Sequence, residues 1–385
     1  MATNNNDKTL NVPHLRFPEF NGEWEKKRIS EFCTLLKGTG ISKDQLSTNG
    51  NPCILYGELY TKYKAEIINE VLSCTELDAN TLVKSKVNDV IIPCSGETAI
   101  DIATARYVPF DDVLLGGDLN ILRSNKVNGS FLAYQLNGKR KYDIARVAQG
   151  VSVVHLYGEH LKNIVISLPV IEEQQKISRL LHLLDERIAT QNKIIEDLKK
   201  LKSAIRKKMF SLLKDEYTES FEINQLLDYE QPTAYIVAND EYSTDTSLTP
   251  VLTANKGFIL GYTDEKFGIY QKGECIIFDD FTMDAKYVSF PFKVKSSAIK
   301  ILTAKPNVNL RFMFEYLSYW ELKSEGHKRH YISEIASLVI ELPSKERQSI
   351  IASLMTSLNS KLDIEAKTKI RYEEQKRYLL SQMFI

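Results

Sequence analysis

An internal duplication constrains this chain more than any other feature of its sequence. Residues 166–210 and 340–384 align without a gap at an offset of 174 positions. The identical pairs include Leu168/Leu342, Pro169/Pro343, Glu172/Glu346, Gln174/Gln348, Ile177/Ile351, Leu180/Leu354, Leu184/Leu358, Lys193/Lys367 and Lys202/Lys376. Both segments also end in Met-Phe, at 209–210 and 383–384. A long repeat at this spacing predicts two equivalent structural units within one chain.

Each copy of the repeat has the pattern of a long helix. Pro169 and Pro343 stand just before the two segments, where a proline does little harm to a helix. In the first copy, apolar residues recur at steps of four and three from Ile177 onward, with interruptions at Gln191 and Lys202. This is the spacing of a coiled-coil seam, so we expect the two helices to pair. At about 1.5 Å per residue, roughly 40 residues form a rod of about 60 Å.

The segments outside the repeat predict globular domains. They are rich in short apolar runs bounded by Gly, Pro and Asp, a pattern typical of strands and turns, with helical stretches between them. We therefore expect an α/β protein with two mixed α/β domains, separated by two long antiparallel coiled-coil helices in a pseudo-two-fold arrangement. The expected order is a flexible N-terminus at 1–13, a first domain at 14–167, a first helix at 168–215, a second domain at 217–340 and a second helix at 341–385.

Composition and motifs exclude several classes of protein. The 50 Lys and Arg residues balance 50 Asp and Glu residues, which excludes a globally basic nucleic-acid coat but leaves local basic stripes open. The sequence has no apolar run of about 18 residues and no export signal, so we expect a cytoplasmic protein. It also lacks the phosphate loop of ATPases, the Asn/Asp-Pro-Pro-aromatic motif of amino-methyltransferases and the common hydrolase motifs. We therefore expect no catalysis and no cofactor on this chain.

The cysteines, a histidine pair and an acidic string are the three candidate metal ligands in the sequence, and none of them predicts a metal site. The five cysteines lack the close spacing of zinc ligands. His327 and His330 are separated by two cations, which oppose a metal dication. The acidic string that ends in Asp279 and Asp280 is interpreted as a strand followed by a turn.

Local charge and symmetry favour a nucleic-acid partner. An approximate dyad within one chain suits duplex DNA, which has its own dyad, or two copies of a partner protein. A basic cluster lies at 139–146, and lysines alternate with aromatic residues at 286–295. The Gly-His-Lys-Arg-His string at 326–330 has the composition of a phosphate-facing loop. The alternatives are a duplicated scaffold that only joins other chains, and charged faces that are simply solvated.

Several strings carry a resemblance to a known family. They are the two Leu-Pro-x-x-Glu-x-Gln strings at 168–174 and 342–348, His14–Phe20, Ser95–Thr98, Gly116–Leu122, Pro250–Ala254, Ile277–Thr282 and Phe292–Ala298. In these the sequence resembles the specificity subunits of type I restriction–modification enzymes, over nearly the whole chain. The duplicated helix beginnings are the specific part of the match.

The resemblance implies a non-catalytic subunit that reads a bipartite, asymmetric target in double-stranded DNA. It implies two methyltransferase subunits as partners, which modify adenine N6 with S-adenosylmethionine. In the full complex, two restriction subunits that use ATP and Mg²⁺ are added. None of these cofactors is expected on this chain, and no membrane contact is expected.

Base-reading residues do not follow from the family, so the candidates rest on charge and position. The DNA-contact candidates are Lys37, Ser95, Thr98, Arg106, Lys139, Arg140, Lys141, Arg146, Lys256, Thr282, Lys286, Lys293, Lys323, His327, Lys328, Arg329 and His330. Docking surfaces for partner subunits are expected where the repeat identities are densest. The residues there are Gln174, Ile177, Leu180, Leu184, Gln348, Ile351, Leu354 and Leu358.

Two other functional classes stay open from the sequence. One is a dimeric coiled-coil regulator that binds DNA alone, although a homodimer supplies its own dyad and needs no internal duplication. The other is a catalytic DNA-modifying enzyme, for which no motif is present. A methyl-transfer assay on the chain alone distinguishes the enzyme from the recognition subunit.

Overall fold

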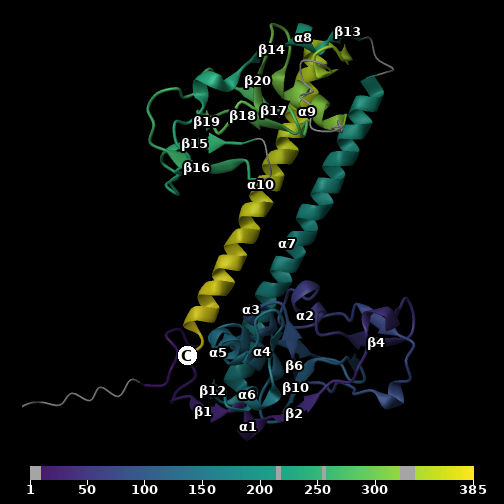
Figure 1. Cartoon of the computed structure of the whole chain (residues 1–385), viewed down its shortest axis with the longest axis vertical. Coiled ribbons are helices and arrows are strands. Elements are labelled where there is room, and N and C mark those ends of the chain that lie inside the picture. Colours follow the sequence, from purple (N-terminus) through teal and green to yellow (C-terminus); the bar gives the residue numbers. More distant parts are fainter. Residues whose placement is uncertain (1–9, 214–217, 254–256, 321–333) are drawn as a thin grey trace, which may run out of the picture. The chain divides into compact units, whose positions relative to one another are not determined.

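The protein is a mixed α/β chain that divides into two compact units. The structure, a computed structural model, describes residues 10–213, 218–253, 257–320 and 334–385 (Figure 1). The first unit comprises Met1–Asn192 and Lys367–Ile385, and the second comprises Lys193–Ala366. Helix α7 (Ile171–Leu212) begins in the first unit and ends in the second, whereas α10 (Lys345–Gln382) begins in the second and ends in the first. The expected fold class, two mixed α/β domains with two long helices, is confirmed.

The first unit is built on a four-stranded antiparallel sheet. Its strand order is β2 (Thr34–Lys37), β10 (Leu119–Arg123), β6 (Asp89–Pro93) and β8 (Arg106–Val108). Strand β6 is buried along its whole length, as its apolar run predicts. Helix α4 (Gly129–Asn137) packs on β6 and β8, and the core lies between them.

Smaller elements complete the first unit. Strand β1 (Glu25–Arg28) pairs with β12 (Val165–Leu168), and β7 (Ser95–Gly96) pairs with β11 (Val154–His155). A second sheet has the order β3 (Leu46–Ser47), β5 (Ser73–Thr75), β4 (Asn51–Ile54), β9 (Leu114–Leu115). The short helices are α1 (Ile29–Phe32), α2 (Glu58–Thr61), α3 (Ala99–Ile102), α5 (Lys141–Val147) and α6 (Gly158–Lys162).

The second unit repeats this frame with different additions. Its central sheet has the order β14 (Leu227–Glu230), β20 (Ile299–Ala304), β17 (Cys275–Asp279), β18 (Ala285–Val288), and α9 (Leu310–Tyr319) packs on β17 and β18. Strand β13 (Glu219–Glu222) pairs with β21 (Val339–Leu342), and the short helix α8 (Ile223–Leu226) follows β13. A three-stranded sheet of β16 (Ile259–Thr263), β15 (Thr249–Leu252) and β19 (Lys293–Val294) corresponds to the β5, β4 and β9 part of the first unit's second sheet, since the middle strand of each pairs antiparallel with one neighbour and parallel with the other.

The repeated glutamine fastens each long helix to its own domain in the same way. Gln174 accepts a hydrogen bond from the Asn128 backbone N–H (2.9 Å) and donates one to the Pro169 carbonyl (2.8 Å). Gln348 accepts one from the Asn309 backbone N–H (2.8 Å) and donates one to Pro343 (2.9 Å). Each asparagine is also the N-cap of the helix that covers the sheet, α4 or α9. The duplication therefore extends beyond the long helices into the domains.

The repeated Met-Phe at the end of each long helix fills the core of the other helix's domain. Phe384, just beyond the end of α10, packs against Phe131 with ring centroids 5.2 Å apart. Phe210, near the end of α7, packs against Phe312 at 5.6 Å. Both phenylalanines are buried. Each domain is thus held by the start of one long helix and the end of the other.

Polar contacts pair the two helices within the first unit. Lys376 on α10 lies 2.6 Å from the Asp185 carboxylate on α7, and Arg187 lies over the Tyr372 ring at 5.8 Å. Residue numbers rise along α7 as they fall along α10, so the helices are antiparallel here. Among the described helices, none has a segment that is long and apolar enough to cross a membrane.

Candidate nucleic-acid interface

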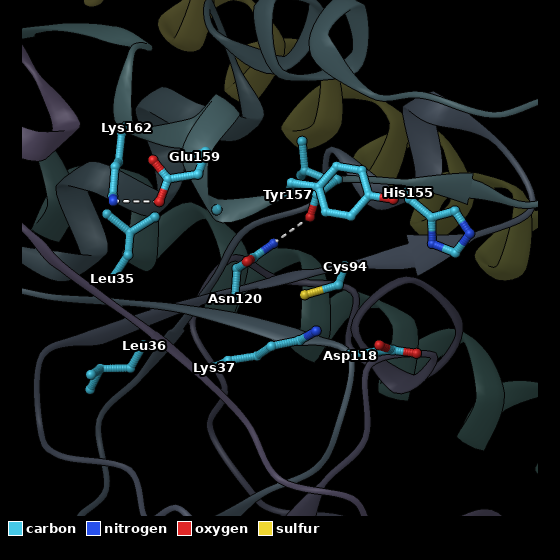
Figure 2. Close-up of a pocket in the computed structure, with 12 residues that line it drawn as sticks. Leu35, Leu36, Lys37, Cys94, Asp118, Asn120, His155, Tyr157, Glu159 and Lys162 are labelled. Carbon is cyan, nitrogen blue, oxygen red and sulfur yellow. Dashed lines mark hydrogen bonds and ion pairs between the residues drawn. The ribbon is translucent and has the colours of Figure 1, made fainter.

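The first unit has a concave surface where the ends of its central strands meet. A cavity of about 360 Å³ lies there, shown in Figure 2 with its lining side chains. Lys37 ends β2, Cys94 follows β6, and Asp118 precedes β10. Asp118 has φ = 57°, and its carbonyl accepts a hydrogen bond from the Cys94 N–H at 2.6 Å. With this tight turn, the side chains of Lys37, Cys94 and Asp118 lie together at the bottom of the cavity, which we call its floor.

A segment that starts at the end of β11 forms the rim of this cavity. His155 and Tyr157 lie with their rings stacked, centroids 6.2 Å apart and planes at 26°. The Asn120 amide donates to the Leu156 carbonyl at 2.9 Å and so holds the segment in place. Both rings are largely exposed, with Tyr157 at 54%. The rim therefore presents aromatic faces above a polar floor.

The floor offers one cation, one carboxylate and a neutral thiol. Burial raises the pKa of the Cys94 thiol to about 11, and nearby Lys37 opposes this only in part. The Asp118 carboxylate accepts a hydrogen bond from the Ser95 hydroxyl at 3.1 Å. Lys37 is exposed. Such a set can hydrogen-bond to base edges, while the aromatic rim provides stacking or groove contacts.

A second hollow adjoins the first at Asp118. Its volume is about 910 Å³, and it is lined by Ser42, Lys43, Tyr56, Tyr60 and Glu97 among others. Asp118 lines both hollows. We call the two hollows together the first-unit concave surface; donors, acceptors and aromatic rings line it.

Four residues of this surface escaped the sequence analysis: Asp118, Asn120, His155 and Tyr157. A signal for Asp118 was present, because Gly116-Gly117-Asp118 stands between two apolar runs and predicts a turn at a strand end. Nothing in the sequence indicates that residues 155–157 return to the ends of β2 and β6. That contact depends on the pairing of β7 with β11.

The predicted serine and threonine near this surface are partly engaged elsewhere. Thr98 is the N-cap of α3 and accepts a hydrogen bond from the Asp101 N–H at 3.1 Å. Ser95 is buried and donates to Asp118. Thr98 is exposed and stays a candidate for DNA contact, whereas Ser95 supports Asp118.

The prediction for Arg106 is wrong. Its side chain is buried and donates to the backbone carbonyls of Leu59 (3.1 Å) and Tyr63 (2.8 Å). Burial lowers the pKa of Arg106, and Glu66 and Asp185 oppose that shift. Arg106 ties α2 to β8 and has no free face for a phosphate.

The basic cluster at 139–146 separates into two kinds of residue. Lys139 and Arg146 are exposed, and the Arg146 side chain keeps 79% of its surface in solvent. Arg140 donates to the Ile385 carbonyl at 3.1 Å and pairs with Asp143. Lys141 is half-buried, and burial lowers its pKa. Lys139 and Arg146 therefore remain candidates, while Arg140 holds the end of the chain against α5.

In the second unit, one prediction is corrected and two stay untested. Lys293 is fully buried; its ammonium lies 2.6 Å from Glu265 and donates to the Phe267 carbonyl at 2.9 Å, so it cannot contact DNA. Thr282 is exposed in the turn after β17, and Lys286 is half-buried on β18. The remaining candidates, Lys256, Lys323, His327, Lys328, Arg329 and His330, lie outside the described residues.

The acidic end of β17 forms a turn, as predicted from the sequence. The Asp279 carboxylate accepts hydrogen bonds from the backbone N–H groups of Phe281 (2.7 Å) and Thr282 (2.9 Å). Asp280 is buried 3.4 Å from Lys300. Among the described residues, no group of three or more His, Cys, Asp or Glu side chains has the arrangement of a metal site.

Most of the predicted docking residues pack inside their own domains. Gln174, Ile177, Leu184, Gln348 and Ile351 are all buried against the domain that each helix begins on. Their identity between the two copies therefore reflects the shared packing, not a surface for other subunits. Of the rest, Leu180 and Leu358 are half-buried, and Leu354 is 39% exposed.

The comparisons with known proteins agree on one family. Residues 21–200 and 216–374 each match the type I restriction modification DNA specificity domain. The chain belongs to this family. The two matches fall on the two halves of the duplication, so the family domain occurs twice in this specificity chain.

Curated relatives and a solved structure carry related names. The specificity subunit of the type I restriction enzyme EcoR124I/EcoR124II from Escherichia coli is 39% identical over 178 residues, which is 41% of this chain and 43% of that subunit. The putative MjaX specificity subunit from Methanocaldococcus jannaschii is 24% identical over 97% of this chain and 96% of its own length. The S subunit structure from M. genitalium has a TM-score of 0.70 at 17% identity, over 97% of this chain and 99% of that one, and it shows the shared fold. Both curated relatives are named as specificity subunits, which agrees with the expectation that this chain is a non-catalytic subunit.

Proposed function

We propose that this specificity subunit reads a bipartite, asymmetric DNA target, with one half-site for each domain. The proposal rests on a single comparison within the shared frame. The strand registers make Lys37, which ends β2, equivalent to Gln231, which follows Glu230 at the end of β14. The exposed Lys37 thus stands in one domain where the other has a half-buried amide, which accepts a hydrogen bond from Lys300 at 2.9 Å and lies next to the Glu230 carboxylate in the chain. Two readers with the same frame but different charge around one place suit two different sequences.

The side chains of Lys37 and Glu230 favour different bases. An exposed lysine donates to the O6 and N7 acceptors of guanine, whereas a carboxylate accepts from the N4 amino group of cytosine. Glu230 accepts hydrogen bonds from the Tyr235 hydroxyl (2.7 Å) and the Lys272 ammonium (2.7 Å), and these hold its pKa below the usual range although burial opposes them. The carboxylate is therefore ionised and acceptor-only at neutral pH.

The partners in this proposal are two methyltransferase subunits, joined by two restriction subunits in the full complex. Each domain packs against the start of one long helix and the end of the other, in the same way in both units. This equivalence supports two similar docking surfaces. S-adenosylmethionine, ATP and Mg²⁺ then belong to those partner subunits. The exposed Leu354, with the neighbouring Ile350 at 57% exposure, is the part of the former docking prediction that remains accessible.

Two measurements on the natural complex test this function. Mapping methylated adenines in the source genome is expected to give two short, different half-sites separated by unread base pairs. Mass measurement of the complex purified through this chain is expected to give two methyltransferase subunits per specificity chain. A continuous or palindromic motif, or a single methyltransferase in the stable complex, contradicts the proposal.

The dimeric DNA-binding regulator gains no support from a described feature. Each domain already contacts two helices of its own chain, so the helix pairing that a homodimer needs is satisfied internally. Sedimentation of the chain alone separates the two: a regulator is a dimer, while the proposed subunit is a monomer.

A further inference from the structure

A hairpin on the first unit holds an apolar side chain in solvent. Val151, between α5 and β11, is 98% exposed, more than any other large apolar residue among those described. Val153 beside it is 53% exposed. Apolar residues exposed singly are ordinary on protein surfaces, so exposure alone does not indicate a site. The geometry of the hairpin and its location add the evidence.

The backbone of this hairpin is held firmly. Gln149 and His155 exchange both backbone hydrogen bonds, at 2.9 Å and 2.7 Å. Gly150 has φ = 126°, and a Cβ there would lie 2.1 Å from the Val153 carbonyl oxygen. Only glycine fits this turn without displacement of the backbone. The tip is therefore preorganised, and placing Val151 against a ligand costs little further ordering.

The base of the hairpin is part of the first-unit concave surface. Val154 and His155 pair with Gly96 and Ser95, and the next residue, Leu156, donates its N–H to the Cys94 carbonyl at 2.7 Å. His155 and Tyr157 are rim residues of the cavity that has Lys37 and Asp118 on its floor (Figure 2). The hairpin that carries Val151 is therefore continuous with the rim of a surface whose polar groups are the proposed base contacts.

The chemistry of the tip limits what it contacts. A stable protein–protein interface needs a broad, well-packed patch, which two valines do not supply. In the DNA major groove, the thymine C5-methyl group is an apolar feature among donors and acceptors, and a two-stranded β-ribbon fits into that groove. A compact β-branched side chain flanked by polar neighbours matches such a methyl group.

We propose that the hairpin Gln149–His155 enters the major groove of the half-site read by the first unit, where Val151 contacts a thymine methyl group. This inference rests on the proposed DNA-reading function. It assigns Val151 a role in specificity, with Lys37 and Asp118 supplying the polar contacts beside it.

The test uses the whole complex, purified through this chain, and DNA that carries the mapped target. Val151→Ser is expected to weaken specific binding by about threefold to tenfold, because one apolar contact is lost. Val87→Ser is the matched control, since Val87 is 51% exposed in the same unit but lies in the loop before β6. The control is expected to bind as the wild type does.

Replacing thymines of the first half-site one at a time with deoxyuridine, which lacks the methyl group, identifies the contact. One replacement is expected to weaken wild-type binding by a similar factor, and Val151→Ser is expected to lose nothing further on that DNA. The inference would be overturned if Val151→Ser bound less tightly than the wild type by the same factor on thymine DNA and on deoxyuridine DNA at every position. It would also be overturned if Val151→Ser bound the target as tightly as the wild type does. If the wild-type complex showed no preference for the mapped target, the proposed function itself would fail.

Discussion

Both units place a lysine at an equivalent point of the helix pair. The corresponding carboxylate comes from the other long helix in the first unit and from the domain in the second. In the first unit, Lys376 on α10 contacts Asp185 on α7, and the Tyr134 hydroxyl of α4 donates to Asp185 at 2.6 Å. In the second, Lys202 on α7 lies 3.9 Å from Glu315 on α9, and the Asn359 amide on α10 donates to Glu315 at 3.2 Å. The repeat makes the two lysines equivalent.

The same alignment makes Asp185 equivalent to Asn359, and the N-caps of α4 and α9 make Tyr134 equivalent to Glu315. Of these two equivalent positions, the long helix carries the carboxylate in the first unit and the domain carries it in the second. Removing the carboxylate at this place, or adding another one to the buried cluster, is costly. The charges of each domain therefore complement those at its own end of the helix pair and would not complement those at the other end.

Each cluster has one further charged member. Glu66 contacts Lys376 in the first unit, and burial of Glu66 is outweighed by this lysine, which holds the carboxyl pKa below its usual range. Arg206 contacts Glu315 at 2.6 Å in the second. The lysine of the first unit is therefore the main cation of its cluster, whereas the lysine of the second is an auxiliary one.

The largest expected effect tests what the two units share. Phe384→Ala and Phe210→Ala each remove a buried ring from an aromatic cluster, and each is expected to cost about 3–5 kcal/mol. Hydrogen exchange measured by mass spectrometry is expected to show the loss of protection in the first unit for Phe384→Ala and in the second for Phe210→Ala. Phe267→Ala, at a 66% exposed ring, is the control. Loss of protection in both units from either change would show that the units are not separately held.

The next effect tests where the units differ. Lys376→Ala leaves two buried carboxylates without their cation and is expected to cost about 3–5 kcal/mol. Lys202→Ala leaves Glu315 with Arg206 and is expected to cost about 1 kcal/mol or less. Denaturant unfolding of the two variants measures this difference. Equal losses would contradict the assignment of Lys202 as auxiliary.

A charge exchange sharpens the matching between domain and helix. Tyr134→Glu adds a carboxylate beside Asp185, whose pKa burial already raises, and is expected to cost about 2–4 kcal/mol. Adding Asp185→Asn reproduces the arrangement of the second unit and is expected to recover more than half of that loss. If the double variant is no more stable than Tyr134→Glu, the two clusters are not interchangeable in this way.

The smallest effect falls on DNA binding. Lys37→Ala is expected to cost about 1–3 kcal/mol and to relax one position of the first half-site only. Glu230→Gln is expected to relax a position of the second half-site only. Lys139→Ala, at an exposed cation, is expected to weaken all sequences alike and to reduce the salt dependence. Binding of single-base variants of the target at several salt concentrations distinguishes base contacts from phosphate contacts.

The sequence was sufficient for the frame because helix periodicity and the ungapped repeat are local signals. Lys202 and Gln191 interrupt the seam, and the structure shows that Lys202 is there to meet Glu315. Burial of single cations was not predictable. Arg106 and Lys293 have the same charge as an exposed DNA contact, and only the tertiary fold brings Leu59, Tyr63 and Glu265 to them.

For the five docking candidates that are buried, the prediction was wrong for a related reason. Identity between two copies of a helix marks any shared environment, and here Gln174 and Gln348 share an intramolecular one. The rim of the concave surface also escaped prediction, because a two-residue strand pair gives no periodic signal.

The central claim is that two unlike readers occupy one repeated frame, and domain replacement tests it most directly. Residues 217–339 are exchanged for the same region of a related specificity subunit, keeping α7 and α10 unchanged, and methylated adenines are mapped in cells that carry the complex. The account predicts that the half-site read by the second unit changes while the other half-site is retained. A simultaneous change in both half-sites, or in neither, would contradict it.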